Sequence, residues 1–125
     1  MPETFTTARK QASAFARAKL SENPLFLDTE TTGLERSDEI VEISIIDDDG
    51  NCVFESLVRP SKPIPAQATR LHGITNEMVQ SARPWPVLWP LLRSVLLGRL
   101  IIIYNAQFDL RMMQQSHARY RLPWR

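Results

Sequence analysis

A segment rich in β-branched residues, followed by a short acidic turn and a second segment with apolar residues, constrains the fold more than any other feature of this sequence. Residues 40–46 (IVEISII) carry Ile or Val at most positions, and residues 52–58 follow after the turn 47–51 (DDDGN). β-Branched side chains favour strands, and Asp-Gly pairs accept the positive φ that a tight hairpin requires. The two segments therefore predict an antiparallel hairpin.

Two further apolar segments predict strands outside this hairpin. Residues 25–27 (LFL) are typical of a short buried strand that ends at Asp28, and residues 29–38 then form a polar loop. Residues 100–104 (LIIIY) are the most apolar segment of the chain. We expect them to form a strand that is buried on both faces.

Capping residues and helical spacing place the helices between and after these strands. We expect short helices at 66–71 and 76–80, and a helix from 105 to about 119. Because Pro90 would kink a longer helix, we expect the main apolar helix to begin near Trp89. The expected order of strands and helices is β-β-β-α-β-α, which predicts an α/β fold with a mixed sheet and flanking helices.

Length and composition indicate one small domain. The chain has 125 residues, 43% of them hydrophobic, with a net charge of +1 and a single cysteine. Any affinity for phosphate must then come from a local site rather than from overall charge. We expect residues 1–22 to form an amphipathic helix and residues 23–125 to form the domain. With no apolar run of membrane-spanning length, a cytoplasmic location is the default expectation.

Two carboxylates at the end of the first predicted strand are the first candidate site. Asp28 and Glu30 are separated by one residue, so strand alternation places both side chains on the same side. Oxygen ligands gathered in this way suit hard cations such as Mg²⁺ or Mn²⁺. A solvated polar turn explains the same residues about equally well, since Asp and Thr are common in turns.

A third carboxylate follows the last predicted strand in a similar way. Asp109 falls in the first turn of the helix that begins after residue 104. The carboxyl ends of neighbouring strands are where ligands gather in sheet folds. A carboxylate that only stabilises the helix N-terminus is the alternative. Asp28 and Glu30 at the end of one strand, together with Asp109 after another, favour a shared ligand-binding site over either alternative.

Four linked motifs resemble the DnaQ-like 3′-5′ exonucleases of the DEDD family, which includes the proofreading subunit of bacterial DNA polymerase III. They are residues 26–33 (FLDTETTG), 40–43 (IVEI), 64–75 (with IP and LHGIT at its ends) and 104–109 (YNAQFD). The resemblance covers roughly residues 25–113. It implies a ribonuclease H-like fold and metal-dependent hydrolysis of phosphodiester bonds at nucleic-acid 3′ ends.

The resemblance also implies roles for particular residues. Asp28, Glu30 and Asp109 would be the catalytic ligands of two divalent metals, Mg²⁺ or Mn²⁺, and such clustered carboxylates raise at least one pKa. The residues implied in nucleotide binding are Thr31, His72, Asn105 and Phe108. His72 equally suits a helix cap, and Phe108 equally suits the core. The implied partners are nucleic acid, with DNA favoured over RNA but RNA left open, and a DNA polymerase.

Trp85 and Trp89 are two aromatic residues for which base stacking and core packing are both considered. Both indoles could stack on bases. Their setting among prolines and leucines favours packing.

The sequence departs from the family after Asp109. No acidic residue follows it, His117 is the only later histidine, and Tyr104 stands where the family usually has His. The fourth metal-binding Asp and the general base of the family are thus not matched. We expect a C-terminally incomplete domain, either a fragment or a natural short protein, that is weak or inactive. A homodimer covering the incomplete face, or a non-catalytic nucleic-acid or protein interaction module, are the further expectations.

Overall fold

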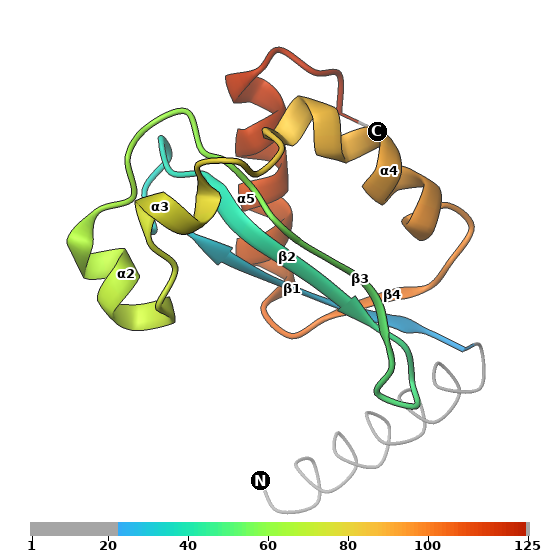
Figure 1. Cartoon of the computed structure of the whole chain (residues 1–125). Coiled ribbons are helices and arrows are strands. Elements are labelled where there is room, and N and C mark those ends of the chain that lie inside the picture. The colour runs from blue at the N-terminus through green and yellow to red at the C-terminus, as the bar shows by residue number, and fades with distance from the viewer. Residues whose placement is uncertain (1–22, 125) are drawn as a thin grey trace, which may run out of the picture.

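The computed structural model describes residues 23–124. The predicted helix at 1–22 lies outside these residues. Figure 1 shows a sheet with helices packed against it. In chain order the elements are β1 (Leu25–Thr31), β2 (Ile40–Ile46), β3 (Cys52–Leu57), α2 (Ala66–His72), α3 (Asn76–Val79), α4 (Trp85–Leu96), β4 (Ile101–Ile103) and α5 (Ala106–Arg119).

The predicted hairpin and mixed sheet are confirmed. The strand order is β3-β2-β1-β4, with β2 antiparallel to both β1 and β3 and with β4 parallel to β1. Asp47 closes the β2–β3 turn, because its carboxylate accepts the backbone N–H groups of Asp49 and Asn51 at 2.9 and 2.8 Å. Gly50 supplies the positive φ of 84° that the turn requires.

The first strand is longer than the sequence predicted. Instead of ending at Asp28, β1 continues through Glu30, which pairs with Glu42 of β2, to Thr31. The polar residues fit inside the strand because the buried hydroxyls have acceptors. Thr29 donates to a carboxylate of α5, and Thr31 donates to the Gly33 carbonyl at 2.9 Å.

The expectation that the last strand is buried on both faces is wrong. Strand β4 has only the three residues Ile101–Ile103, all half-buried, and it lies at the sheet edge beside β1. Ile101 and Ile103 pack against the core, whereas Ile102 points to the other face. An apolar run alone does not reveal whether a strand is central or at an edge.

The predicted order placed one helix between the third and fourth strands, whereas the connection between β3 and β4 contains three helices, α2, α3 and α4. The helix predicted to begin near Trp89 begins at Trp85 and continues through Pro90. Burial offsets the hydrogen bond that Pro90 removes, because Trp85, Leu88 and Leu92 all lie in the core.

The main core lies between the sheet and helices α4 and α5, which Figure 1 shows together on one face. The indole N–H of Trp85 donates to His117 Nδ1 at 3.0 Å and joins these two helices. A second apolar cluster links the sheet to α2 and α3 through Val41, Ala68 and Val79. None of the helices within residues 23–124 has the length and apolar character needed to cross a membrane.

Two adjacent leucines of α4 test this packing. Leu92 is fully buried, whereas Leu91 is 45% exposed. We expect Leu92→Ala to lower the free energy of unfolding by about 2–5 kcal/mol, because it leaves a cavity in the core. The matched variant Leu91→Ala should cost less than about 1 kcal/mol. Urea denaturation measures both; equal losses would contradict this placement of α4.

Candidate functional site

Strand alternation sorts the residues of β1 onto two faces. Leu25, Leu27 and Thr29 are buried toward α4 and α5, whereas Asp28 is exposed and Glu30 is half-buried on the opposite face. The two carboxylates therefore share one face, as predicted. We call this face, which carries the even-numbered residues of β1, the outer face.

Helix α5 brings the third carboxylate to the same strand. Asp109 is only 3% exposed, and its Oδ1 accepts a hydrogen bond from the Thr29 hydroxyl at 2.5 Å. The alternative of a carboxylate that only stabilises the helix end does not describe this contact. Asp109 instead joins the first turn of α5 to the strand that carries Asp28 and Glu30.

The three carboxylates influence one another electrostatically. Burial raises the pKa of the Glu30 carboxyl; the nearby His72 opposes this, while the charges of Asp28 and Asp109 raise the pKa further. Burial likewise raises the pKa of Asp109; the hydrogen bond from Thr29 lowers it, and the charge of Asp28 adds to the rise. The expectation that at least one of these carboxyls has a raised pKa is confirmed for Glu30 and Asp109, but burial is a larger cause than repulsion among the carboxylates.

Close clustering of oxygens occurs elsewhere on the chain. Among residues 23–124, the group of three acidic side chains whose oxygens all lie within 4.8 Å of one another is Asp47, Asp48 and Asp49. The oxygens of Asp28, Glu30 and Asp109 are spread more widely. The Asp47 carboxylate is already used by the hairpin turn, so the turn accounts for its position.

A cavity of about 430 Å³ opens beside Glu30. One wall is the end of β1 with the segment that follows it, and the other is helix α2 with the residue before it. The lining residues are Glu30, Thr31, Thr32, Gly33, Leu34, Glu35 and Asp38 on the first wall, and Pro65, Gln67, Ala68, Leu71 and His72 on the second. The cavity thus combines one of the carboxylates with apolar surface.

His72 ties the two walls together. The Ile74 N–H donates to Nδ1 at 3.0 Å, so in the neutral ring the proton lies on Nε2, which donates to the Thr31 carbonyl at 3.0 Å. Gly73, with a φ of 79°, reverses the chain so that Ile74 can reach the ring. Both ring nitrogens are therefore engaged in holding α2 against β1.

The structure places only one of the other residues predicted to bind a nucleotide in the cavity wall, and the other two lie at the start of α5. Thr31 lines the cavity, and Asn105 is exposed at the start of α5. Phe108 is half-buried against the core, with the Arg111 guanidinium 5.6 Å from its ring. Their roles in binding stay predictions.

The two tryptophans that could stack on bases pack instead. Trp85 is 1% exposed, and its ring stacks on that of Trp89 at 5.8 Å between centroids. His117, the histidine that follows Asp109, is also buried beside them.

Sequence reasoning missed most of the cavity walls. Asp38 accepts hydrogen bonds from the Thr32 hydroxyl and the Glu35 N–H, both at 2.8 Å, and it shapes the loop after β1. A side chain at Gly33 would collide with Asp38, so this glycine allows close packing within the chain. Leu71 is 86% exposed. The sequence predicted the helix that contains Leu71, but the exposure of this leucine, which marks the cavity wall, could not be predicted before the helix was positioned.

The raised pKa of Asp109 predicts how stability depends on pH. The folded state holds this proton more tightly than the unfolded state, so unfolding becomes easier as pH rises from the unfolded pKa through the folded pKa. Asp109→Asn removes this titration. In EDTA, we expect the free energy of unfolding of the Asp109→Asn variant to rise relative to that of the unmodified chain as the pH increases over that range.

Thr29→Val is the companion variant. It removes the hydrogen bond that lowers the pKa of Asp109, so the fall in stability should extend to higher pH. Urea denaturation across the pH range measures both variants. Parallel stability curves for all three proteins would show that Asp109 is not buried as described.

Comparison with known proteins supplies independent findings. The sequence profile of an exonuclease family matches residues 25–123. Exonuclease CP81 of Escherichia phage 186 is 44% identical over 113 residues, which cover 89% of this chain and 58% of the phage protein. A DNA polymerase III subunit epsilon-like protein of Rhodobacter capsulatus is 36% identical over 110 residues, which cover 78% of this chain and 16% of that protein.

Solved structures give the same picture. Exonuclease X in complex with 5′ overhanging duplex DNA has a TM-score of 0.57 and 36% identity, over 71% of this chain and 52% of that one. The nuclease domain of 3′hExo, a DEDDh family member bound to rAMP, has a TM-score of 0.69 and 18% identity, over 82% of this chain and 61% of that one. The fold is therefore ribonuclease H-like. The chain spans little more than half the length of the phage protein and of Exonuclease X.

Proposed function

The chain belongs to the exonuclease family whose profile matches residues 25–123, and from this premise we propose that its site performs metal-dependent 3′-5′ hydrolysis of nucleic acid. The observation that carries the proposal is the arrangement of Asp28, Glu30 and Asp109 around one strand. Two of them share the outer face of β1, and the third reaches the same strand through Thr29.

The chemistry of these residues fits divalent cations. The donors are all carboxylate oxygens, which Mg²⁺ and Mn²⁺ prefer. Burial and mutual repulsion raise the pKa of Glu30 and Asp109, and a bound cation would relieve both costs. Asp28 is exposed and Glu30 half-buried, so these two carboxylates have room to turn toward a shared ion.

Bound divalent cations would supply charge neutralisation at the phosphate and activation of a water molecule. The chain itself contributes position. Thr29 holds the Asp109 carboxylate, and His72 holds the Thr31 carbonyl that follows Glu30. The cavity beside Glu30 would receive the terminal nucleotide of the strand, with Thr31 and His72 in its wall and Asn105 and Phe108 near the start of α5.

A nuclease assay with matched Glu variants tests this function. On a 5′-labelled single-stranded DNA, we expect a ladder that shortens from the 3′ end in Mn²⁺ and stops in EDTA. Glu30→Gln should slow hydrolysis roughly 10²-fold or more, because it removes a charged metal ligand. Glu55→Gln, on the exposed edge strand β3, is the control and should leave the rate unchanged. Hydrolysis that survives EDTA, or equal rates for both variants, would refute the proposal.

The rate of the 125-residue chain itself should be low. No acidic residue follows Asp109 among the 125 residues, so the fourth ligand of the family has no counterpart in them. The later histidine, His117, is buried and bonded to Trp85, so it does not supply the general base. Loss of a general base alone typically costs about 10²–10⁴-fold. We expect a C-terminally extended version that supplies an Asp and a His to cleave at least about 10²-fold faster. Equal rates for the two proteins would contradict this expectation.

The alternative function is a non-catalytic module that keeps nucleic-acid binding. DNA binding without hydrolysis, by both the 125-residue chain and the extended version, would support it. The homology with polymerase III subunits makes a DNA polymerase the expected protein partner, and homodimer formation stays a prediction.

A further inference from the structure

The outer face of the sheet carries an apolar row beside the carboxylates. In the strand register, Phe26 of β1 lies between Ile46 of β2 and Ile102 of β4. Phe26 and Ile102 are half-buried and Ile46 is 41% exposed. Within residues 23–124, helices α4 and α5 cover the opposite face of the sheet.

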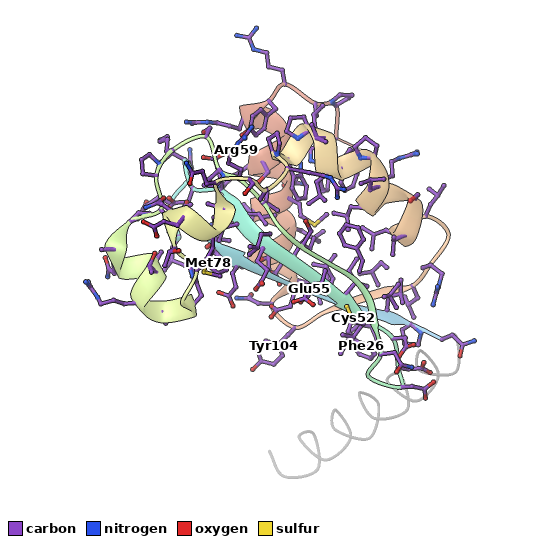
Figure 2. All side chains as sticks on the ribbon, viewed as in Figure 1. Phe26, Cys52, Glu55, Arg59, Met78 and Tyr104 are labelled. Atoms are coloured by element: carbon purple, nitrogen blue, oxygen red, sulfur yellow. The ribbon has the colours of Figure 1, made fainter. Side chains whose placement is uncertain are left out.

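Tyr104 stands next to this row and next to Asp28. The parallel register of β1 and β4 ends with the pair Leu27 and Ile103, so Tyr104 follows at the level of Asp28. Ile101 and Ile103 face the core, which places Tyr104 by alternation on the outer face. Its side chain is fully exposed, at 102% of the reference area, and Figure 2 shows it projecting into solvent.

A fully exposed aromatic ring beside a carboxylate site is suited to bind a ligand with a planar apolar surface. A dry protein interface does not suit this face, because it would also bury the carboxylates of Asp28, Glu30 and Glu42. A nucleobase attached to a phosphate does suit it, since the ring takes the base while the phosphate stays with the carboxylates and their cations.

The cavity and Tyr104 lie on opposite sides of the carboxylates. The cavity adjoins Glu30 on the side of α2, whereas Tyr104 adjoins Asp28 on the side of β4. A strand whose scissile phosphate sits at Asp28 and Glu30 therefore has one nucleotide on each side. We propose that Tyr104 stacks on the base of the penultimate nucleotide, the one that keeps the new 3′ end after cleavage. This inference rests on the proposed function and names a second nucleotide subsite for it.

Two single-stranded DNA probes test the stacking directly. They are identical except that one carries an abasic residue at the penultimate position, and both have a phosphorothioate as the last linkage to suppress cleavage. Fluorescence anisotropy in Mn²⁺ gives the dissociation constants. We expect Tyr104→Ala to weaken binding of the base-containing probe roughly 5- to 100-fold and to leave the abasic probe unchanged.

Two further variants separate stacking from other roles. Tyr104→Phe keeps the planar ring and should bind like the unmodified chain, whereas Tyr104→Leu keeps an apolar side chain without the ring and should bind like Tyr104→Ala. Equal weakening of both probes by Tyr104→Ala, or no weakening of either, overturns the inference.

The outcome also separates this inference from the proposed function. If the unmodified chain binds both probes and shortens ordinary DNA in Mn²⁺, but Tyr104→Ala matches it on both probes, only the inference fails. If the unmodified chain binds neither probe and cleaves no DNA, the proposed function fails and the inference fails with it.

Discussion

The hydrogen bond from Thr29 to Asp109 is the contact on which the site depends. It joins two segments 80 residues apart, the central strand β1 and the first turn of α5. Thr29 lies on the buried face of β1, so its hydroxyl needs an acceptor, and the Asp109 carboxylate supplies one. The same bond brings the third acidic side chain to the strand that carries the other two.

Alternation along β1 explains how one strand serves both stability and chemistry. Leu25 and Leu27 fill the core on one face, while Asp28 and Glu30 occupy the outer face. The cost is that carboxylates stand in a row across the sheet, with Glu30 directly opposite Glu42. Burial raises the pKa of both glutamates, and their neighbours' negative charges add to the rise. A ligand that neutralises charge on this face would remove that cost.

Local sequence patterns predicted the parts of the fold that depend on local physics. The hairpin follows from β-branched residues around an Asp-Gly turn, and the helix end at Gly73 follows from its left-handed backbone. Asp28 and Glu30 were found because alternation is a local property. The linked motifs identified the exonuclease family, and the family profile confirms it.

Non-local contacts account for what the sequence did not predict. Strand β1 extends past Asp28 because distant acceptors satisfy its hydroxyls, and β4 lies at an edge because it has a single neighbouring strand among the described residues. Helix α4 tolerates Pro90 because Trp85 and Leu92 are buried against other elements. The cavity depends on how α2 packs against the loop after β1, which His72 fixes.

The central claim is that Asp28, Glu30 and Asp109 together bind a divalent cation, and calorimetric titration with Mn²⁺ tests it most directly. The hairpin turn provides the control, since Asp49 belongs to the other acidic cluster. We expect Asp28→Asn to weaken Mn²⁺ binding at least about 10-fold and Asp49→Asn to leave it unchanged. Undiminished binding by Asp28→Asn, with binding lost in Asp49→Asn, would place the cation at the turn and contradict this account.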